Sequence, residues 1–170
     1  MLASPISPLF APRGLASLIL AASIAAIGGA WTYEYLGYLP CELCYKERVP
    51  YYAAFLIAPV AALAAQTGRL SLARGAFLLM ALLFAGDVAL SVYHSGVEWK
   101  IFAGPSDCSG AMTGAATVED FMQQLRKVKV VRCDEPNLWV MGLTLANWNV
   151  VVAAALAGLA TLGALRSTRS

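Results

Sequence analysis

The sequence predicts an all-α membrane protein, a bundle of four transmembrane helices with two loops on the outer face of the membrane. Three observations support this fold. The 170 residues are 59% hydrophobic and only 13% charged, and their mean hydropathy of +0.67 is far above that of ordinary soluble proteins. Four stretches are nearly free of charge and reach the roughly 20 residues needed to cross a bilayer. The acidic residues are concentrated in two of the connecting segments, and the other connecting and terminal segments carry only basic residues.

The four apolar stretches define a single integral membrane domain over residues 1–170. We place the spans at about 14–33, 49–68, 75–97 and 142–165, and the outer loops at about 34–48 and 98–141. The first span also resembles the apolar part of a cleavable signal peptide. Its length and the three further spans favour a retained helix.

The basic residues predict the orientation. Those without acidic neighbours lie before the first span, between the second and third spans, and after the fourth: Arg13, Arg69, Arg74, Arg166 and Arg169. Such segments are usually cytoplasmic. The two loops on the other side hold every Asp and Glu except Asp87, and all Trp and Tyr lie in or beside these loops. The net charge of +2 is small and the basic residues form no dense stripe, so the sequence does not indicate nucleic-acid binding.

A short amphipathic helix is predicted within the second loop. Thr117 and Asp120 have the spacing of a capping box. Apolar residues then recur at helical intervals: Val118, Phe121, Met122, Leu125 and Val128. The helix is expected either to lie on the membrane surface or to pack on the protein itself.

All four cysteines fall in the two outer loops: Cys41, Cys44, Cys108 and Cys133. They fit structural disulfides, a zinc site or a redox relay. A disulfide between Cys41 and Cys44 closes so small a loop that it stabilises little, which favours a reactive dithiol. Only this pair has the close spacing of zinc ligands, so no metal is expected. Two pairs on one side of the membrane can exchange disulfides with each other.

Arg48 follows Cys44 by four residues, so the two side chains share a face if the segment is helical. A guanidinium there favours a thiolate at Cys44 and stabilises negative charge on the carbonyl oxygen of an electron acceptor. The alternative is an interfacial arginine that anchors the second span. Pro50 lacks a backbone donor, so we expect the local helix to begin only after Arg48.

Several segments in order resemble the disulfide bond formation protein B (DsbB) family. They are 40–44 (PCELC), 47–51 (ERVPY), 93–98 (YHSGVE) and 104–108 (GPSDC). The resemblance covers the four spans and both loops. It implies a quinone-dependent protein dithiol oxidoreductase of the bacterial inner membrane, with both termini cytoplasmic and the cysteine loops periplasmic.

The resemblance also implies a partner and an order of steps. The partner is a DsbA-like periplasmic thioredoxin-fold oxidase, whose reduced dithiol attacks Cys108. Cys133 then leaves and attacks Cys41, and Cys44 is released to reduce ubiquinone or menaquinone beside Arg48. The resemblance favours resting disulfides within each loop, although four cysteines allow three connectivities.

Two further residues have open roles. His94 is the sole histidine and lies near the outer end of the third span. The resemblance places this region close to the quinone, where an imidazole could donate a hydrogen bond or a proton, but an interfacial histidine without chemistry fits as well. Asp87 is the sole charge within a span. It fits either a proton path or a hydrogen bond between helices.

Two alternatives to this function remain. One is a vitamin K epoxide reductase-like relay, which expects a Cys-x-x-Cys motif at a late helix, whereas the fourth span has no cysteine. The other is a scaffold without enzymatic activity, whose loops are cross-linked by inert disulfides of low potential.

Overall fold

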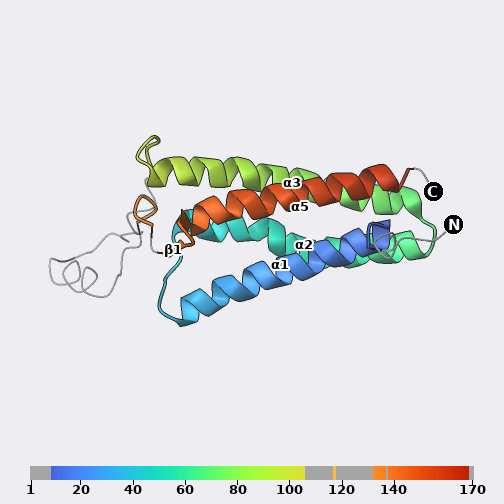
Figure 1. The fold of residues 1–170 in the computed structure, drawn as a ribbon, viewed down its shortest axis with the longest axis horizontal. Helices are drawn as coiled ribbons and strands as arrows, with labels where there is room; N and C mark the ends of the chain where they lie inside the picture. Colours follow the sequence, from blue (N-terminus) through green and yellow to red (C-terminus); the bar gives the residue numbers. More distant parts are fainter. Residues whose placement is uncertain (1–8, 106–116, 118–131, 137, 169–170) are drawn as a thin grey trace.

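Four long helices form an elongated bundle in the computed structural model, which describes residues 9–105, 117, 132–136 and 138–168 (Figure 1). They are α1 (Pro12–Tyr35), α2 (Glu42–Gln66), α3 (Leu70–Glu98) and α5 (Leu145–Arg166). Within this part of the chain, these four are long and apolar enough to cross a membrane. The predicted fold of four spans is confirmed. The amphipathic helix predicted over 117–128 lies, apart from Thr117, outside the described residues.

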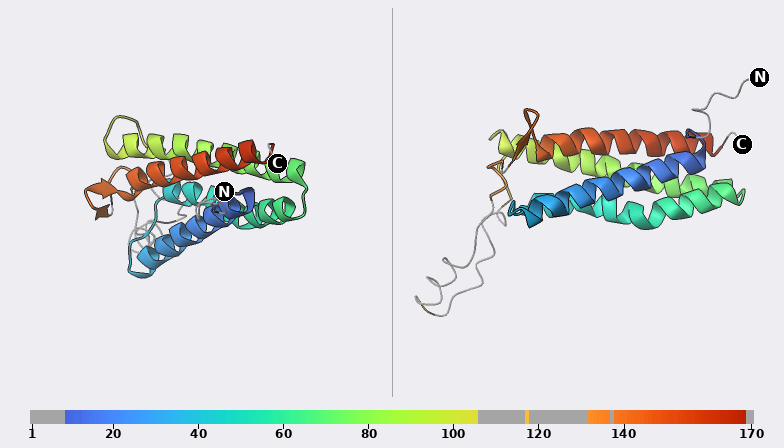
Figure 2. Two further views of the ribbon diagram at one scale, coloured as in Figure 1. Left: turned by 45° about the vertical axis from the view of Figure 1, so that its right-hand side comes forward. Right: turned by 60° about the horizontal axis from the view of Figure 1, so that its bottom comes forward.

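Successive helices of the bundle run in opposite directions. The start of α1 and the end of α5 lie at one end of the bundle (Figures 1 and 2). The end of α1, the start of α2, the end of α3 and the start of α5 lie at the other (Figure 1). The first predicted loop and the described flanks of the second therefore meet at the same end.

The contacts between the helices are unequal. The most extensive is between α3 and α5, and α2 packs against both α1 and α3, whereas α1 and α5 share a smaller contact. Alanines make up nearly half of the shared core, among them Ala16, Ala54, Ala58, Ala61 and Ala160. Such residues let helix backbones approach closely within a membrane. At Gly163 of α5, a Cβ atom would collide with the ring of Phe77 in α3, so this crossing requires glycine.

The second helix begins earlier than the sequence predicts. α2 starts at Glu42, and Cys41 caps it by accepting a hydrogen bond from the backbone N–H of Cys44. Pro50 lies inside the helix, so the expectation that the helix begins only after Arg48 is wrong. Proline removes one backbone hydrogen bond, and packing offsets this loss because Pro50 is itself buried.

A two-stranded hairpin connects the second loop to α5. Strand β1 (Trp139–Val140) pairs antiparallel with β2 (Leu143–Thr144). The intervening Met141 and Gly142 both have positive φ, 52° and 83°, as in the tight turns typical of hairpins. The Thr144 hydroxyl donates to Glu98 Oε2 at 2.6 Å and so ties the start of α5 to the end of α3. Strands of two residues are too short for alternating hydrophobicity to predict them.

Candidate functional site

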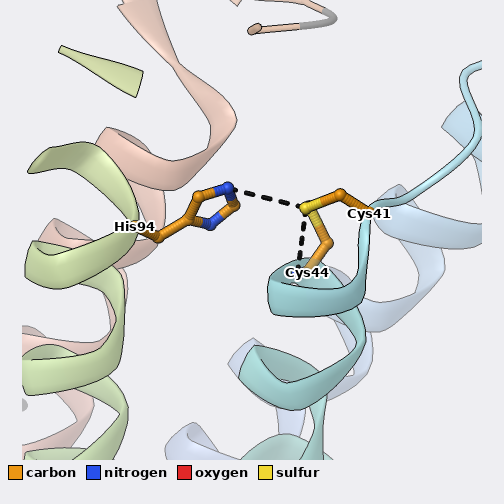
Figure 3. A group of neighbouring side chains, drawn as sticks. All are labelled: Cys41, Cys44 and His94. Atoms are coloured by element: carbon orange, nitrogen blue, oxygen red, sulfur yellow. Dashed lines mark hydrogen bonds between the residues drawn. The ribbon is translucent and has the colours of Figure 1, made fainter. Parts of the chain in front are cut away.

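Two free thiols lie at the start of α2 (Figure 3). Cys41 is the capping residue, and Cys44 lies one helical turn further on. Their Sγ atoms are 3.0 Å apart and hydrogen-bonded to each other. The side chain of Cys41 is buried, and that of Cys44 is partly exposed. A small movement of either side chain is enough to close a disulfide between them.

A histidine from α3 and a glutamate from α2 complete this buried group. His94 points toward the sulfurs (Figure 3), and its Nε2 lies 3.6 Å from Cys41 Sγ. On the other side of the ring, Nδ1 lies 2.8 Å from Glu47 Oε1. A carboxylate in this position holds the imidazole in one orientation. Cys41, His94 and Glu47 thus form a hydrogen-bonded chain in which the thiol proton can move to the ring.

Cys41 is the more acidic thiol of the pair. The hydrogen bond from the Cys44 thiol lowers the pKa of Cys41 to about 4, with a further contribution from His94 and against the effect of burial. Its place at a helix N-terminus also favours negative charge. Cys41 is therefore a thiolate at neutral pH and can act as a nucleophile.

Arg48 lies on α2 close to this group, but its guanidinium is bound elsewhere. Nη1 donates to Glu34 Oε1 on α1, and the guanidinium lies 5.3 Å from the centre of the Tyr45 ring. Among the described residues, no hydrogen bond joins Arg48 to Cys44. The predicted effects of Arg48 on Cys44 and on an acceptor stay predictions.

Cys133 lies next to the first pair of cysteines. It is disulfide-bonded, and neither Cys41 nor Cys44 is its partner, since both are free. Its side chain is 2% exposed and packs in one buried cluster with Cys41, Leu43 and Val97. The structure therefore brings three of the four predicted redox cysteines together, and Cys108 lies outside the described residues.

A cavity of about 310 Å³ lies beside the cysteines. Its apolar lining includes Ala25, Ala26, Ile27 and Ala30 of α1 and Trp148 and Val152 of α5. Its polar lining includes Cys41, Cys44, Glu47, Arg48 and His94. Apolar walls with a few converging polar groups are typical of sites for small, largely apolar ligands.

A comparison with models of protein families matches residues 12–163 to disulfide bond formation protein DsbB. The chain belongs to the DsbB family. No curated protein and no solved structure matches it. Membership makes the chain a multi-pass membrane oxidoreductase of disulfide-bond formation, and the predicted family is confirmed.

Glu47 belongs to the hydrogen-bonded group of this DsbB site, but the sequence assigns it no role. The reason is the position at which the sequence predicts α2 to start. With the helix starting at Glu42, the three-residue spacing from Cys44 to Glu47 places both side chains on one face. The spacing of Cys44 and Glu47 could have indicated this shared face, but Pro50 led to a predicted helix start after both residues.

A second polar group lies deeper in the bundle and includes Asp87. The Asn149 side chain of α5 accepts a hydrogen bond from Tyr51 at 2.6 Å. Its amide nitrogen donates to Ser91 at 2.7 Å and to Asp87 Oδ2 at 3.3 Å. The Asp87 side chain is buried, and it contacts α5 rather than the cysteine pair. In this DsbB family member Asp87 thus belongs to a contact between helices.

The thiols and the imidazole could also bind a metal ion. The ligand atoms of Cys41, Cys44 and His94 all lie within 4.8 Å of one another. Two thiolates and an imidazole suit Zn²⁺. This ligand set exists only while both cysteines are reduced, because a disulfide removes two of the three ligands.

Proposed function

We propose that this DsbB family member reoxidises a DsbA-like thioredoxin-fold oxidase and passes the electrons to a membrane quinone. One observation carries the proposal. The Cys41–Cys44 pair borders an apolar cavity within a membrane bundle, and it also contacts Cys133 of the second loop. A dithiol in this position can exchange with a protein disulfide and donate electrons to a lipid-soluble acceptor.

The first half of the reaction is disulfide exchange. A thiolate of the partner attacks Cys108, and Cys133 leaves as a thiolate. Cys133 then attacks Cys41 of the oxidised Cys41–Cys44 pair, which forms a Cys41–Cys133 bond and releases Cys44 as a thiolate. The second partner thiol next displaces Cys108, so the partner leaves with its disulfide. Cys108 finally attacks Cys133 and releases Cys41.

The second half oxidises the reduced pair. Cys44 and Cys41 lose two electrons, their disulfide reforms, and a quinone is reduced to the quinol. The two protons of the quinol equal the two lost by the partner dithiol. The chain of Cys41, His94 and Glu47 supports this step, since it can hold a proton beside the cavity. Arg48 lines the same cavity and suits a carbonyl oxygen that gains negative charge.

The shape of the bundle supports a ligand that arrives from the membrane. The contact between α1 and α5 is the smaller one, and both helices line the cavity. Ubiquinone and menaquinone both have a flat ring with two carbonyl oxygens, which suits apolar walls with a few polar groups. Membership of the DsbB family supports a bacterial inner membrane, and the basic residues at the other end of the bundle support a periplasmic position for the cysteine end.

The test is anaerobic quinone reduction by the purified protein. The protein is mixed with a reduced thioredoxin-fold oxidase and a soluble quinone, and the quinone absorbance is followed. We expect one quinone reduced per partner dithiol with the wild type and none with Cys44→Ser. Cys133→Ser serves as a matched control: it should stop reduction by the partner but keep reduction by dithiothreitol, which can reach Cys41 and Cys44 directly.

The outcomes separate the relay from a cross-linked scaffold. A wild type that reduces no quinone with either thiol donor, although partner and quinone react in a known system, contradicts the relay. A Cys44→Ser variant as active as the wild type contradicts the role of that cysteine.

A further inference from the structure

The helix α3 ends in a turn that normally requires glycine, but the residue there is Lys100. The Lys100 N–H donates to the Val97 carbonyl at 3.0 Å, and the Ile101 N–H donates to the Gly96 carbonyl at 2.8 Å. This pair of hydrogen bonds defines the Schellman end of a helix, in which the residue at the Lys100 position is left-handed. Lys100 has a φ of 61°. A side chain at this position is unfavourable relative to glycine, so another interaction must offset the cost.

The residues around Lys100 fix the direction of this turn. Phe102 lies against Gly96, where a Cβ atom would collide with its ring. The ring of Phe102 also stacks on Tyr93, with centroids 5.8 Å apart, and the Tyr93 hydroxyl donates to the Ala103 carbonyl at 2.7 Å. The turn is therefore held by packing and hydrogen bonds that do not involve the lysine side chain.

The Lys100 side chain reaches across to the second loop. Its ammonium donates to the carboxylate of Asp134 at 2.6 Å and to the backbone carbonyl of the same residue at 2.7 Å. Arg132 donates to both oxygens of this carboxylate, to Oδ1 at 2.9 Å and to Oδ2, which Lys100 also binds, at 2.8 Å. The hydrogen bonds from Arg132 and Lys100 hold the pKa of Asp134 well below its usual range, so the carboxylate stays charged.

In the sequence, Cys133 lies between Arg132 and Asp134, two of the three residues of this charge cluster. Its side chain packs with Cys41 and Val97 in one buried cluster. Val97 also accepts the backbone hydrogen bond of Lys100. The end of α3 therefore supplies the apolar surface beneath Cys133, and the turn that follows it supplies the cation that holds Asp134.

We propose that Lys100 is a positioning residue, whose ammonium binds Asp134 and thereby holds Cys133 against Cys41 for disulfide exchange. The inference deepens the proposed function and rests on it. In the exchange, one cysteine thiolate attacks the disulfide sulfur of the other, the Cys41–Cys133 bond forms, and the previous partner sulfur leaves as a thiolate. No net oxidation takes place. The contribution of Lys100 is a higher effective concentration of one sulfur near the other.

The substitution Lys100→Gly separates this role from a purely structural one. Glycine adopts the left-handed backbone without strain. If Lys100 has only a structural role at the turn, the Lys100→Gly variant should be as stable as the wild type or more stable, and its disulfide exchange should be unchanged. We call the ion pair between Lys100 and Asp134 the clasp. If the clasp positions Cys133, Lys100→Gly should make the disulfide exchange slower and less favourable, in a protein that melts no lower than the wild type. Lys100→Arg retains the charge and should retain most of the exchange.

The experiment measures exchange without partner or quinone. In a Cys44→Ser background, the Cys41 thiolate can attack Cys133 but cannot close its own pair. The ratio of the Cys41–Cys133 bond to the original Cys133 disulfide is read by mass mapping of acid-quenched, non-reduced peptides. We expect Lys100→Gly to lower this ratio about three- to tenfold, as for loss of an exposed ion pair supported by a second hydrogen bond. Lys46→Met removes a charge whose ion pair, within the part of the chain that the structure describes, is with Glu42 of the same helix, and it should leave the ratio unchanged.

Salt gives a second readout. The clasp is an ion pair at the surface, so an increase from about 0.1 to 1 M NaCl should lower the ratio with lysine at position 100 and have little effect with glycine. Equal ratios in lysine and glycine variants, at both salt concentrations, overturn the clasp. If no Cys41–Cys133 bond forms in any variant, and wild-type protein also fails to reduce quinone with dithiothreitol, the proposed function fails with it. If dithiothreitol still drives quinone reduction, only the exchange between loops is overturned.

Discussion

At the residue scale, the reactivity of the site depends on what surrounds one sulfur. Cys41 caps α2, accepts the N–H of Cys44 and contacts His94. Each of these contacts stabilises the thiolate more than the thiol. Glu47 acts one step further away, because it holds the imidazole that faces the sulfur. When reduced, Cys41 is therefore suited to attack a disulfide, and it is a good leaving group when Cys108 attacks Cys133 in the Cys41–Cys133 bond.

The lowered pKa of Cys41 predicts its response to pH. With a pKa of about 4, Cys41 is already fully ionised at pH 6, so its alkylation by iodoacetamide should be nearly constant from pH 6 to 9. An ordinary cysteine, with a pKa of about 8.5, reacts roughly tenfold more slowly for each pH unit by which the pH falls below that value. Peptide mass analysis of the fully reduced protein measures the rate at Cys41 alone.

Removal of the strongest contact should move the pH profile of Cys41 toward that of an ordinary cysteine. In Cys44→Ala the thiol that donates to Cys41 is missing, so the pKa of Cys41 rises and its alkylation becomes slower at pH 6 than at pH 9. A wild-type rate that climbs steeply over this range would refute a thiolate at Cys41.

At the element scale, the contact between α3 and α5 includes one close approach at a glycine. Gly163 faces the ring of Phe77, whereas a Cβ atom added at Gly158 of the same helix would meet no atom within 4 Å. Both are helical glycines within α5. They therefore form a matched pair, which differs in the neighbour that an added methyl group meets.

The two glycines should respond in opposite ways to alanine. Gly163→Ala pushes a methyl group into Phe77 and should lower the free energy of unfolding by about 1–3 kcal/mol. Gly158→Ala should leave it unchanged or raise it by up to about 1 kcal/mol, because alanine favours the helix. Unfolding in detergent, followed by circular dichroism, measures both. Phe77→Leu should partly rescue Gly163→Ala, and equal stability of the two single variants would contradict the tight crossing.

At the scale of the whole molecule, Asn149 joins three helices. It binds Tyr51 of α2 and Ser91 and Asp87 of α3 from its place on α5. A buried polar side chain has few alternative hydrogen-bond partners in an apolar environment, so the hydrogen bonds of Asn149 favour one arrangement of the helices. α1 has no part in these bonds and packs mainly on α2, which leaves room for the cavity.

Loss of this junction should destabilise the bundle. Asn149→Leu leaves the buried groups of Tyr51, Ser91 and Asp87 without this partner and should lower the free energy of unfolding by about 1–3 kcal/mol. Asn147→Leu is the control, since the Asn147 side chain makes no hydrogen bond among the described residues. The same unfolding experiment applies, and equal stability of the two variants would exclude a structural role for Asn149.

Features that depend on local composition can be predicted from the chain alone. The length of each apolar stretch predicts the four spans, because about 20 apolar residues are needed to cross hydrocarbon. The spacing of Cys41 and Cys44 indicates a reactive dithiol, because such a disulfide stabilises little. These arguments need no knowledge of which helices are neighbours.

Which side chains meet at the site depends on the packing of the helices. His94 reaches Cys41 from a different helix, and Lys100 reaches Asp134 from a segment far along the chain. In a membrane the lipid-facing and core-facing sides of a helix are both apolar, so hydrophobic periodicity does not reveal which face packs inward. Which face packs inward is decided by small residues and by buried hydrogen bonds between helices. Both depend on contacts between residues that are far apart in the sequence.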